Sequence, residues 1–278
     1  MARFDGKKIT GLIGNLVFKN TADKKGTIIQ RKAVRVKQTK ASKVTSGIFA
    51  NASRLGKLFR WDLQSLTSGF YDGSMVNRLT KVNRSILEDC YDKATKTYVF
   101  EEGSFQRLEG FEFDSNSLLV NYFLTNAEVI MQDTELTLKI PAFETNKQLK
   151  FPGKANSCKI KLMVGVYNFD LSKKRVHQYQ EVNIEQAQGI VPEQSFVFAA
   201  AEGCLCIVGM GLEYFYNYND INNSLNNKEL SPAGLLWTMV TPGTLLLPLD
   251  EDDPKRVVLR NWAFDEALEL NPKGEEQV

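Results

Sequence analysis

The sequence predicts a mainly β protein in which a basic β-hairpin and two amphipathic helices precede a β-sandwich. Apolar residues alternate with polar ones near the start, then recur every three or four residues, and alternate again after about residue 95. A period of two is typical of strands, and a period near 3.6 is typical of helices. We therefore expect a hairpin with a helical pair over 1–95 and a sandwich domain over 96–278.

The hairpin is expected over 11–38. "LIGNLVF" has the pattern of a first strand, and "TIIQRKAVRVKQ" has the pattern of the returning strand. The segment between them, "KNTADKKG", supplies Asn, Asp and Gly, which tolerate the backbone angles of turns. The return arm places Ile28, Val34 and Val36 on one face.

Two helices should follow. Apolar spacings of three and four run from Lys40 to Leu66, and Thr39 or Ser42 is a suitable N-cap. "TSGFYDGS" ends this helix, and a second pattern runs from Met75 to Cys90. The polar face of the first helix is basic, with Lys43, Arg54, Lys57 and Arg60.

The rest of the chain has the pattern of strands joined by turns. "CKIKLMVGV" places Cys158 and every second residue to Val166 on one face, with Lys159 and Lys161 on the other. "CLCIVGMGLEYFYNY" is apolar on both faces, which is typical of a central strand covered on both sides. Short strands with frequent turns and no helices between them favour a β-sandwich.

The amino-acid composition limits the kinds of protein that this chain can be. Apolar residues make up 43% of the 278 and charged residues 24%, which is typical of a globular protein. The start "MARFDGKKITGLIGNLVF" lacks a secretory signal pattern, and no apolar window is long enough to span a membrane. We therefore expect cytoplasmic assembly, with later association with a virion or similar particle. The four cysteines are expected to be reduced and buried.

No pattern of catalytic residues emerges, so we expect no enzyme, cofactor or metal site. The single histidine, His177, is expected to face solvent on a strand, without the nucleophile and third group of a catalytic triad. The acidic segment "LDEDDPKR" over 249–256 lacks calcium-loop spacing, and a solvated loop is the simpler interpretation, with a cation site as the alternative.

The uneven distribution of charge along the chain is the clearest functional signal in the sequence. Residues 1–60 hold 15 Lys or Arg against two acids, a net charge of +13, whereas the remaining residues hold 20 against 31, a net charge of −11. Such asymmetry indicates a partner. The candidate partner-binding residues share the basic ribbon and the start of the first helix: Lys24, Lys25, Arg31, Lys32, Arg35, Lys37, Lys40 and Lys43.

Three interpretations of this ribbon remain open: a solvated surface, nucleic-acid binding through phosphates, or docking onto the acidic surface of another copy. Docking explains both halves of the charge asymmetry, whereas aromatic residues for base stacking are sparse in the ribbon. A saccharide-binding protein or carbohydrate-active enzyme built on the sandwich is a further class of function. It would expose aromatic residues such as Tyr214, Tyr216 or Tyr218 beside carboxylates, although ordinary strand packing explains these tyrosines more simply.

Several segments resemble an uncharacterised family of Bacteroidota and phage-like gene clusters. They are "GLIGNLVFKN", "KKGTIIQRKAVRVKQTKASKV", "FANASRLGK", "RLEGFEFDSNS", "MVGVYNFDLSKKRVHQY" and "GLEYFYNYNDINNS". The chain departs from the common pattern by having "KQTKAS" where a proline-rich step is usual. The resemblance implies a hairpin–helix segment, a closing sandwich and a particle-associated structural role, and it carries no catalytic residues.

Together these observations predict a structural, self-assembling or partner-docking subunit of a phage-like particle, tail or filament. Its partners would be other copies of itself or neighbouring structural subunits, and it would be a homo-oligomer. The alternative is a nucleic-acid-binding module that uses the same basic residues.

Overall fold

The computed structural model describes residues 2–21, 26–32, 38–219, 221–247 and 261–271. The chain divides into two compact units, Met1–Ser46 and Gly47–Val278, which we call the arm and the body. The sequence predicted a boundary after residue 95, whereas the units of the structure meet at residue 46. The reason is that apolar residues of both predicted helices, from Ile48 onward, share a core with the large sheet of the body.

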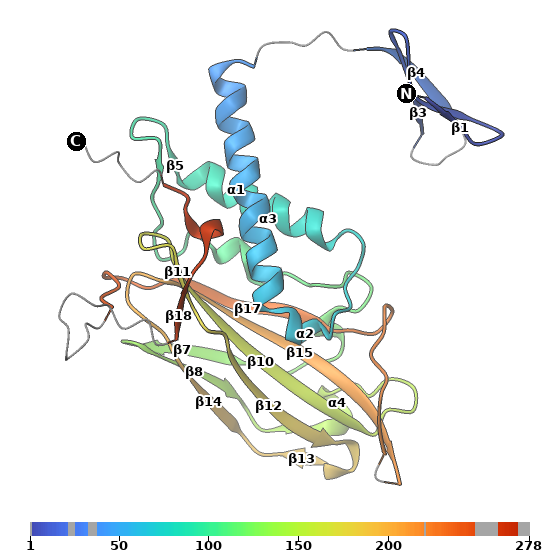
Figure 1. Cartoon of the computed structure of the whole chain (residues 1–278). Coiled ribbons are helices and arrows are strands. Elements are labelled where there is room, and N and C mark those ends of the chain that lie inside the picture. Colours follow the sequence, from blue (N-terminus) through green and yellow to red (C-terminus); the bar gives the residue numbers. More distant parts are fainter. Residues whose placement is uncertain (1, 22–25, 33–37, 220, 248–260, 272–278) are drawn as a thin grey trace. The chain divides into compact units, whose positions relative to one another are not determined.

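The arm contains a four-stranded antiparallel sheet in the order β1-β2-β3-β4 (Figure 1). The sequence predicted that "LIGNLVF" forms one strand. Instead, a tight turn at Gly14 and Asn15 divides this segment between β2 and β3. Gly14 has φ of 55°, a conformation that costs glycine little. The strands are β1 (Arg3–Phe4), β2 (Ile9–Ile13), β3 (Leu16–Asn20) and β4 (Thr27–Arg31).

Three helices follow, and they confirm the two helical patterns. Helix α1 (Lys40–Asp62) continues into a single turn, α2 (Gln64–Thr67), and α3 (Met75–Cys90) begins and ends as predicted. The expected cap is Thr39, whose hydroxyl accepts a hydrogen bond from the Ser42 amide at 3.1 Å.

A seven-stranded antiparallel sheet forms the centre of the body (Figure 1). Two long strands, β10 (Ser157–Asn168) and β15 (Leu205–Tyr218), pair along most of their length. Each also pairs with two shorter strands on its outer edge. These are β11 (Lys173–Arg175), β12 (Gln178–Glu185), β16 (Ile221–Ser224) and β17 (Ala233–Val240), and β18 (Trp262–Phe264) extends β11.

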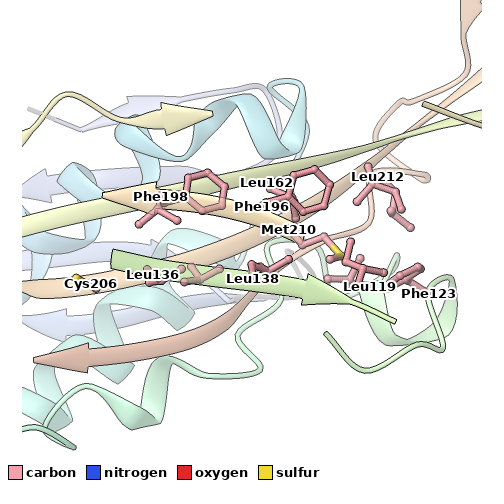
Figure 2. Close-up of a cluster of buried hydrophobic side chains, with 14 of the residues drawn as sticks. Leu119, Phe123, Leu136, Leu138, Leu162, Phe196, Phe198, Cys206, Met210 and Leu212 are labelled. Atoms are coloured by element: carbon pink, nitrogen blue, oxygen red, sulfur yellow. The ribbon is translucent and has the colours of Figure 1, made fainter. Parts of the chain in front are cut away.

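A three-stranded sheet packs against one face of the large sheet. It consists of β7 (Glu128–Gln132), β8 (Glu135–Ile140) and β14 (Gln194–Ala199). Leu136, Leu138, Phe196 and Phe198 extend from it into a core with alternate residues of β10 and β15, such as Leu162 (Figure 2). Strands account for 40% of the described residues against 24% for helices, so the mainly β sandwich is confirmed. The alternation predicted for β10 is confirmed in the same core.

The opposite face of the large sheet is covered by the helices of the body. Met163, Tyr167, Leu205 and Ile207 share a second core with apolar residues of α1, α2 and α3. The central strand β15 is therefore covered on both faces, as its sequence predicted. The approach is close at Gly211, where a Cβ atom would lie 2.3 Å from the Leu66 carbonyl oxygen.

Short elements complete the body. They are β5 (Tyr91–Asp92), β6 (Thr97–Tyr98), η1 (Gln106–Leu108), η2 (Leu119–Asn121), β9 (Phe143–Glu144), α4 (Thr145–Gln148), η3 (Gln186–Gln188), β13 (Ile190–Val191) and η4 (Glu266–Leu268). Cys158, Cys204 and Cys206 are buried free thiols in the sandwich core, as expected, whereas Cys90 is a free thiol that is only partly buried. Burial raises the pKa of Cys204 and of Cys206 to about 12.

Candidate functional site

The arm has no core of its own among its described residues. Every described residue of Met1–Ser46 is exposed or only partly buried. By contrast, 51 apolar residues are buried in the described part of the body. A sheet normally buries its apolar face against a second layer, because that burial drives its folding. Among the described residues of the arm, no second layer therefore covers this sheet.

The strand register places most of the apolar side chains of the arm on one face. Directly paired residues point to the same side of an antiparallel sheet. Ile9 pairs with Phe4, Ile13 with Leu16, and Phe18 with Ile29. The first two pairs are four residues apart along β2 and the last two are two residues apart along β3, and even spacings place them on the same face. Phe4, Ile13, Leu16 and Ile29 expose 45–65% of their surface. We call these six residues the apolar arm face.

Four of the eight predicted partner-binding residues lie in the described part of the arm. Arg31 ends β4 at the edge of the apolar arm face, and Lys32 follows it, donating its amide to the Asn15 carbonyl at 2.6 Å. Lys40 and Lys43 lie in the first turn of α1. All four are exposed, and none forms an ion pair among the described residues. Lys24, Lys25, Arg35 and Lys37 lie outside the described residues.

The body carries an acidic cleft of about 440 Å³ between β6, the end of β10 and the end of β17. Its apolar lining includes Val99, which is 59% exposed, together with Phe100 and Phe169. Its described lining contains no Lys or Arg. The exposed carboxylates are those of Glu101, Glu102 and Asp170, and Glu202 lies over the adjoining Gly243. We call this surface the acidic cleft.

A second pocket of the body, of about 730 Å³, lies between α1 and the segment from β18 to η4. We call it the α1 pocket. Two exposed rings border it, those of Trp61 (59% exposed) and Phe264 (53%). The cationic side chains of Arg54 and Lys57 line the same wall as Trp61.

An ion network forms part of the lining of the α1 pocket. Lys174 Nζ lies 2.7 Å from Asp62 Oδ1 and 3.2 Å from Asp265 Oδ2. Burial alone would lower the pKa of Lys174, but hydrogen bonds and charges from both carboxylates outweigh it and raise that pKa. Burial, followed by the charge of Asp62, raises the pKa of the nearby Tyr167 hydroxyl well above its usual value. Lys174 is thus held as an ammonium ion between two carboxylates.

The other residues singled out in the sequence do not form a common site. His177 is exposed, as expected, but it lies in the connection between β11 and β12 and not on a strand, and it lines the α1 pocket. Tyr214 is buried in the sandwich core, so it cannot border a saccharide groove. Tyr216 and Tyr218 stack at 6.2 Å between ring centroids, and Tyr218 is 61% exposed. The acidic segment 249–256 lies outside the described residues.

Sequence reasoning missed the α1 pocket. It identified Arg54 and Lys57 only as members of a polar helix face, and it did not consider Trp61. A signal was present, because these three residues recur at spacings of three and four, opposite the apolar stripe. The other wall comes from residues about 200 positions later, and no local pattern could have paired the two.

Within the described residues, no group of three or more His, Cys, Asp or Glu side chains is arranged to hold a metal ion. None of the helices described has the length and apolar character needed to cross a bilayer. Comparison with protein-family models finds no matching family, and searches of curated proteins and of solved structures find no match. The resemblance to a phage-like family therefore stays a prediction.

Proposed function

We propose that this protein is a structural subunit that assembles with other copies through its N-terminal arm. The single observation that carries this proposal is the apolar arm face, whose six side chains lack a covering layer among the described residues of the arm. Covering half-exposed isoleucine and leucine side chains contributes about 1 kcal/mol each. A partner that covers several of them would be bound stably.

Charge favours another copy as the partner. Met1–Ser46 contains 12 Lys or Arg and two acids, whereas Gly47–Val278 contains 23 Lys or Arg and 31 acids. An arm of one copy and a body of the next therefore attract each other, whereas two arms repel. The acidic cleft is the best candidate acceptor, because its described lining combines apolar residues with three carboxylates and no cation, and Glu202 lies over the adjoining Gly243.

This mode of docking supports a role in a phage-like particle, tail or filament. An arm that binds the body of the next copy makes a heterologous contact, in which two different surfaces meet. Repeated heterologous contacts generate closed rings or open helical filaments. Both are the architectures of structural subunits, and neither requires a catalytic site.

A charge-swap experiment tests the proposal. The arm variant Arg31→Glu/Lys32→Glu and the cleft variant Glu101→Lys/Glu102→Lys should each be monomeric under conditions in which the wild-type protein assembles. A mixture of the two should form heterodimers, because the reversed arm then meets the reversed cleft. Light scattering at low and high salt, with absorbance at two wavelengths, measures mass and nucleic-acid content together.

A matched control is Glu135→Lys/Glu193→Lys, which reverses two exposed carboxylates away from the cleft and should assemble normally. Loss of assembly only in the arm variant would reject the cleft as acceptor while keeping the arm. A wild-type monomer that purifies with nucleic acid and releases it at high salt would favour the alternative function. Assembly of both charge variants at every salt concentration would contradict the proposal.

A further inference from the structure

The α1 pocket plays no part in the proposed assembly, yet it has the dimensions and chemistry of a ligand site. Its volume of about 730 Å³ lies in the range of roughly 300–1,000 Å³ that is typical of small-molecule sites. Such sites combine apolar or aromatic surface with a few fixed polar groups. The α1 pocket contains both, and all of its lining belongs to the body.

The exposed ring of Trp61 is the first argument for a ligand. Helical spacing places Arg54, Lys57 and Trp61 on one face of α1, so this face presents two cations and an indole to the pocket. Large aromatic side chains are highly buried on average, because their exposure to water is unfavourable. A Trp that exposes 59% of its surface beside a pocket is therefore available to stack on a ring.

The polar groups of the pocket are held in place by contacts within the protein. Lys174 is anchored by Asp62 and Asp265, and Asp265 also accepts a hydrogen bond from the Ala267 amide at 3.0 Å. These contacts fix both donors and acceptors beside the aromatic rings. Fixed donors and acceptors beside an aromatic ring suit a ligand with many hydroxyl groups and an apolar ring face, which is the chemistry of a pyranose sugar.

The free charges of the pocket indicate the kind of sugar. Arg54 and Lys57 form no ion pair among the described residues, and Arg54 donates to the Asn51 side chain. Lys174 binds the carboxylates of Asp62 and Asp265, so this group keeps one net negative charge, and Glu266 forms no ion pair among the described residues. The described lining is balanced overall, with three cations and three carboxylates, but its two free cations lie together on the α1 wall beside Trp61, where they match a ligand with a single negative charge. A phosphate dianion would meet the acidic wall formed by Asp265 and Glu266.

We propose that the α1 pocket binds an acidic saccharide, a sugar that carries one carboxylate per ring. One pyranose ring stacks on Trp61, its carboxylate binds Arg54 and Lys57, and its hydroxyl groups contact Glu266 and the polar lining. The planar guanidinium of Arg54 suits a carboxylate, because it can donate two parallel hydrogen bonds. Glu266 provides an acceptor for hydroxyl groups.

Calorimetric titration of the full chain tests this site. The probes are short oligosaccharides of galacturonate, short oligosaccharides of glucuronate, and sialyllactose, with neutral galactose oligosaccharides as the reference. We expect an acidic probe to bind more tightly than the neutral one. Trp61→Ala should weaken binding of both roughly tenfold, because it removes the stacking surface. Arg54→Gln/Lys57→Gln should remove only the preference for the acidic probe.

Two matched controls lie elsewhere on the body. Tyr218→Ala removes another exposed aromatic ring, and Lys93→Gln/Lys96→Gln removes two other exposed cations, so neither should change binding. Circular dichroism verifies that each variant is folded. Failure of all three acidic probes to bind at millimolar concentration would overturn the proposal. Tighter binding of a nucleoside monophosphate would overturn the assigned ligand class.

Discussion

The arm and the body contain similar strands, but they differ in how far the apolar faces of these strands are buried. Both contain antiparallel strands with an apolar face, but the body covers its large sheet with helices on one side and a second sheet on the other. In the arm, Phe4 is 65% exposed and Ile29 is 59% exposed, whereas Leu162 and Phe198 of the body are at most 2% exposed. The comparison shows that an apolar pattern predicts which face of a strand is apolar. Whether that face is buried then depends on whether a second layer packs against it.

The largest expected effect compares two leucines, one from each region. Leu162→Ala removes a fully buried side chain from the sandwich core and should lower the free energy of unfolding by about 2–5 kcal/mol. Leu16→Ala removes a side chain that is 45% exposed on the apolar arm face and should lower it by less than about 1 kcal/mol. Urea denaturation of dilute protein measures both, because dilution removes any contribution from assembly.

The same pair separates folding from assembly. We expect Leu16→Ala to weaken self-association in light scattering, and a well-folded Leu162→Ala to leave it unchanged. Equal destabilisation by the two substitutions would show that the arm face is buried against the same molecule, and it would remove the contrast between the regions.

A smaller effect concerns a buried cation of the body. Lys161 Nζ lies 2.5 Å from Glu213 Oε2 and donates to the Ser68 hydroxyl at 2.8 Å, and its side chain is 9% exposed. Lys161→Met leaves the Glu213 carboxylate without its partner and should cost about 3 kcal/mol in the free energy of unfolding. Lys19→Met, at an exposed position of β3, should change it by less than about 0.5 kcal/mol.

A double variant tests why Lys161→Met lowers the free energy of unfolding. Lys161→Met/Glu213→Gln removes both charges and should recover much of the loss, because no buried charge then lacks a partner. If the double variant were as unstable as the single one, the loss would come from packing against α2 and not from the unpaired carboxylate.

How well the sequence predicts a feature depends on how far apart along the chain the interacting residues lie. The face of β10 and the bounds of α3 depend on local periodicity, and they were predicted correctly. The division of "LIGNLVF" at Gly14 depends on a two-residue turn, which a seven-residue apolar pattern conceals. The α1 pocket brings Trp61 beside Phe264, and only the folded body places these two residues together. Local patterns therefore predicted the elements, while the candidate ligand site required the tertiary structure.

The smallest expected effect compares two aspartates, Asp72 of the body and Asp5 of the arm. Burial alone would raise the pKa of Asp72, but hydrogen bonds from Ser74, Ser115 and Arg78 outweigh it and lower that pKa well below its usual value. The amides of Lys7 and Lys8 also lower the pKa of Asp5, although Asp5 is fully exposed. Both carboxylates thus accept backbone hydrogen bonds, and burial distinguishes them.

A lowered pKa in the folded state stabilises the protein above the usual value of 3.8, and this stabilisation is lost as the pH falls through the folded value. Asp72→Asn should therefore unfold at a lower urea concentration than the wild type near neutral pH, and the difference should shrink at about pH 3. Asp5→Asn should unfold like the wild type at both pH values, because Asp5 lies in the connection between β1 and β2 of the arm, which has no buried residue among those described. A pH-dependent loss in Asp5→Asn equal to that in Asp72→Asn would mean that the folding of the arm contributes to the stability of the body.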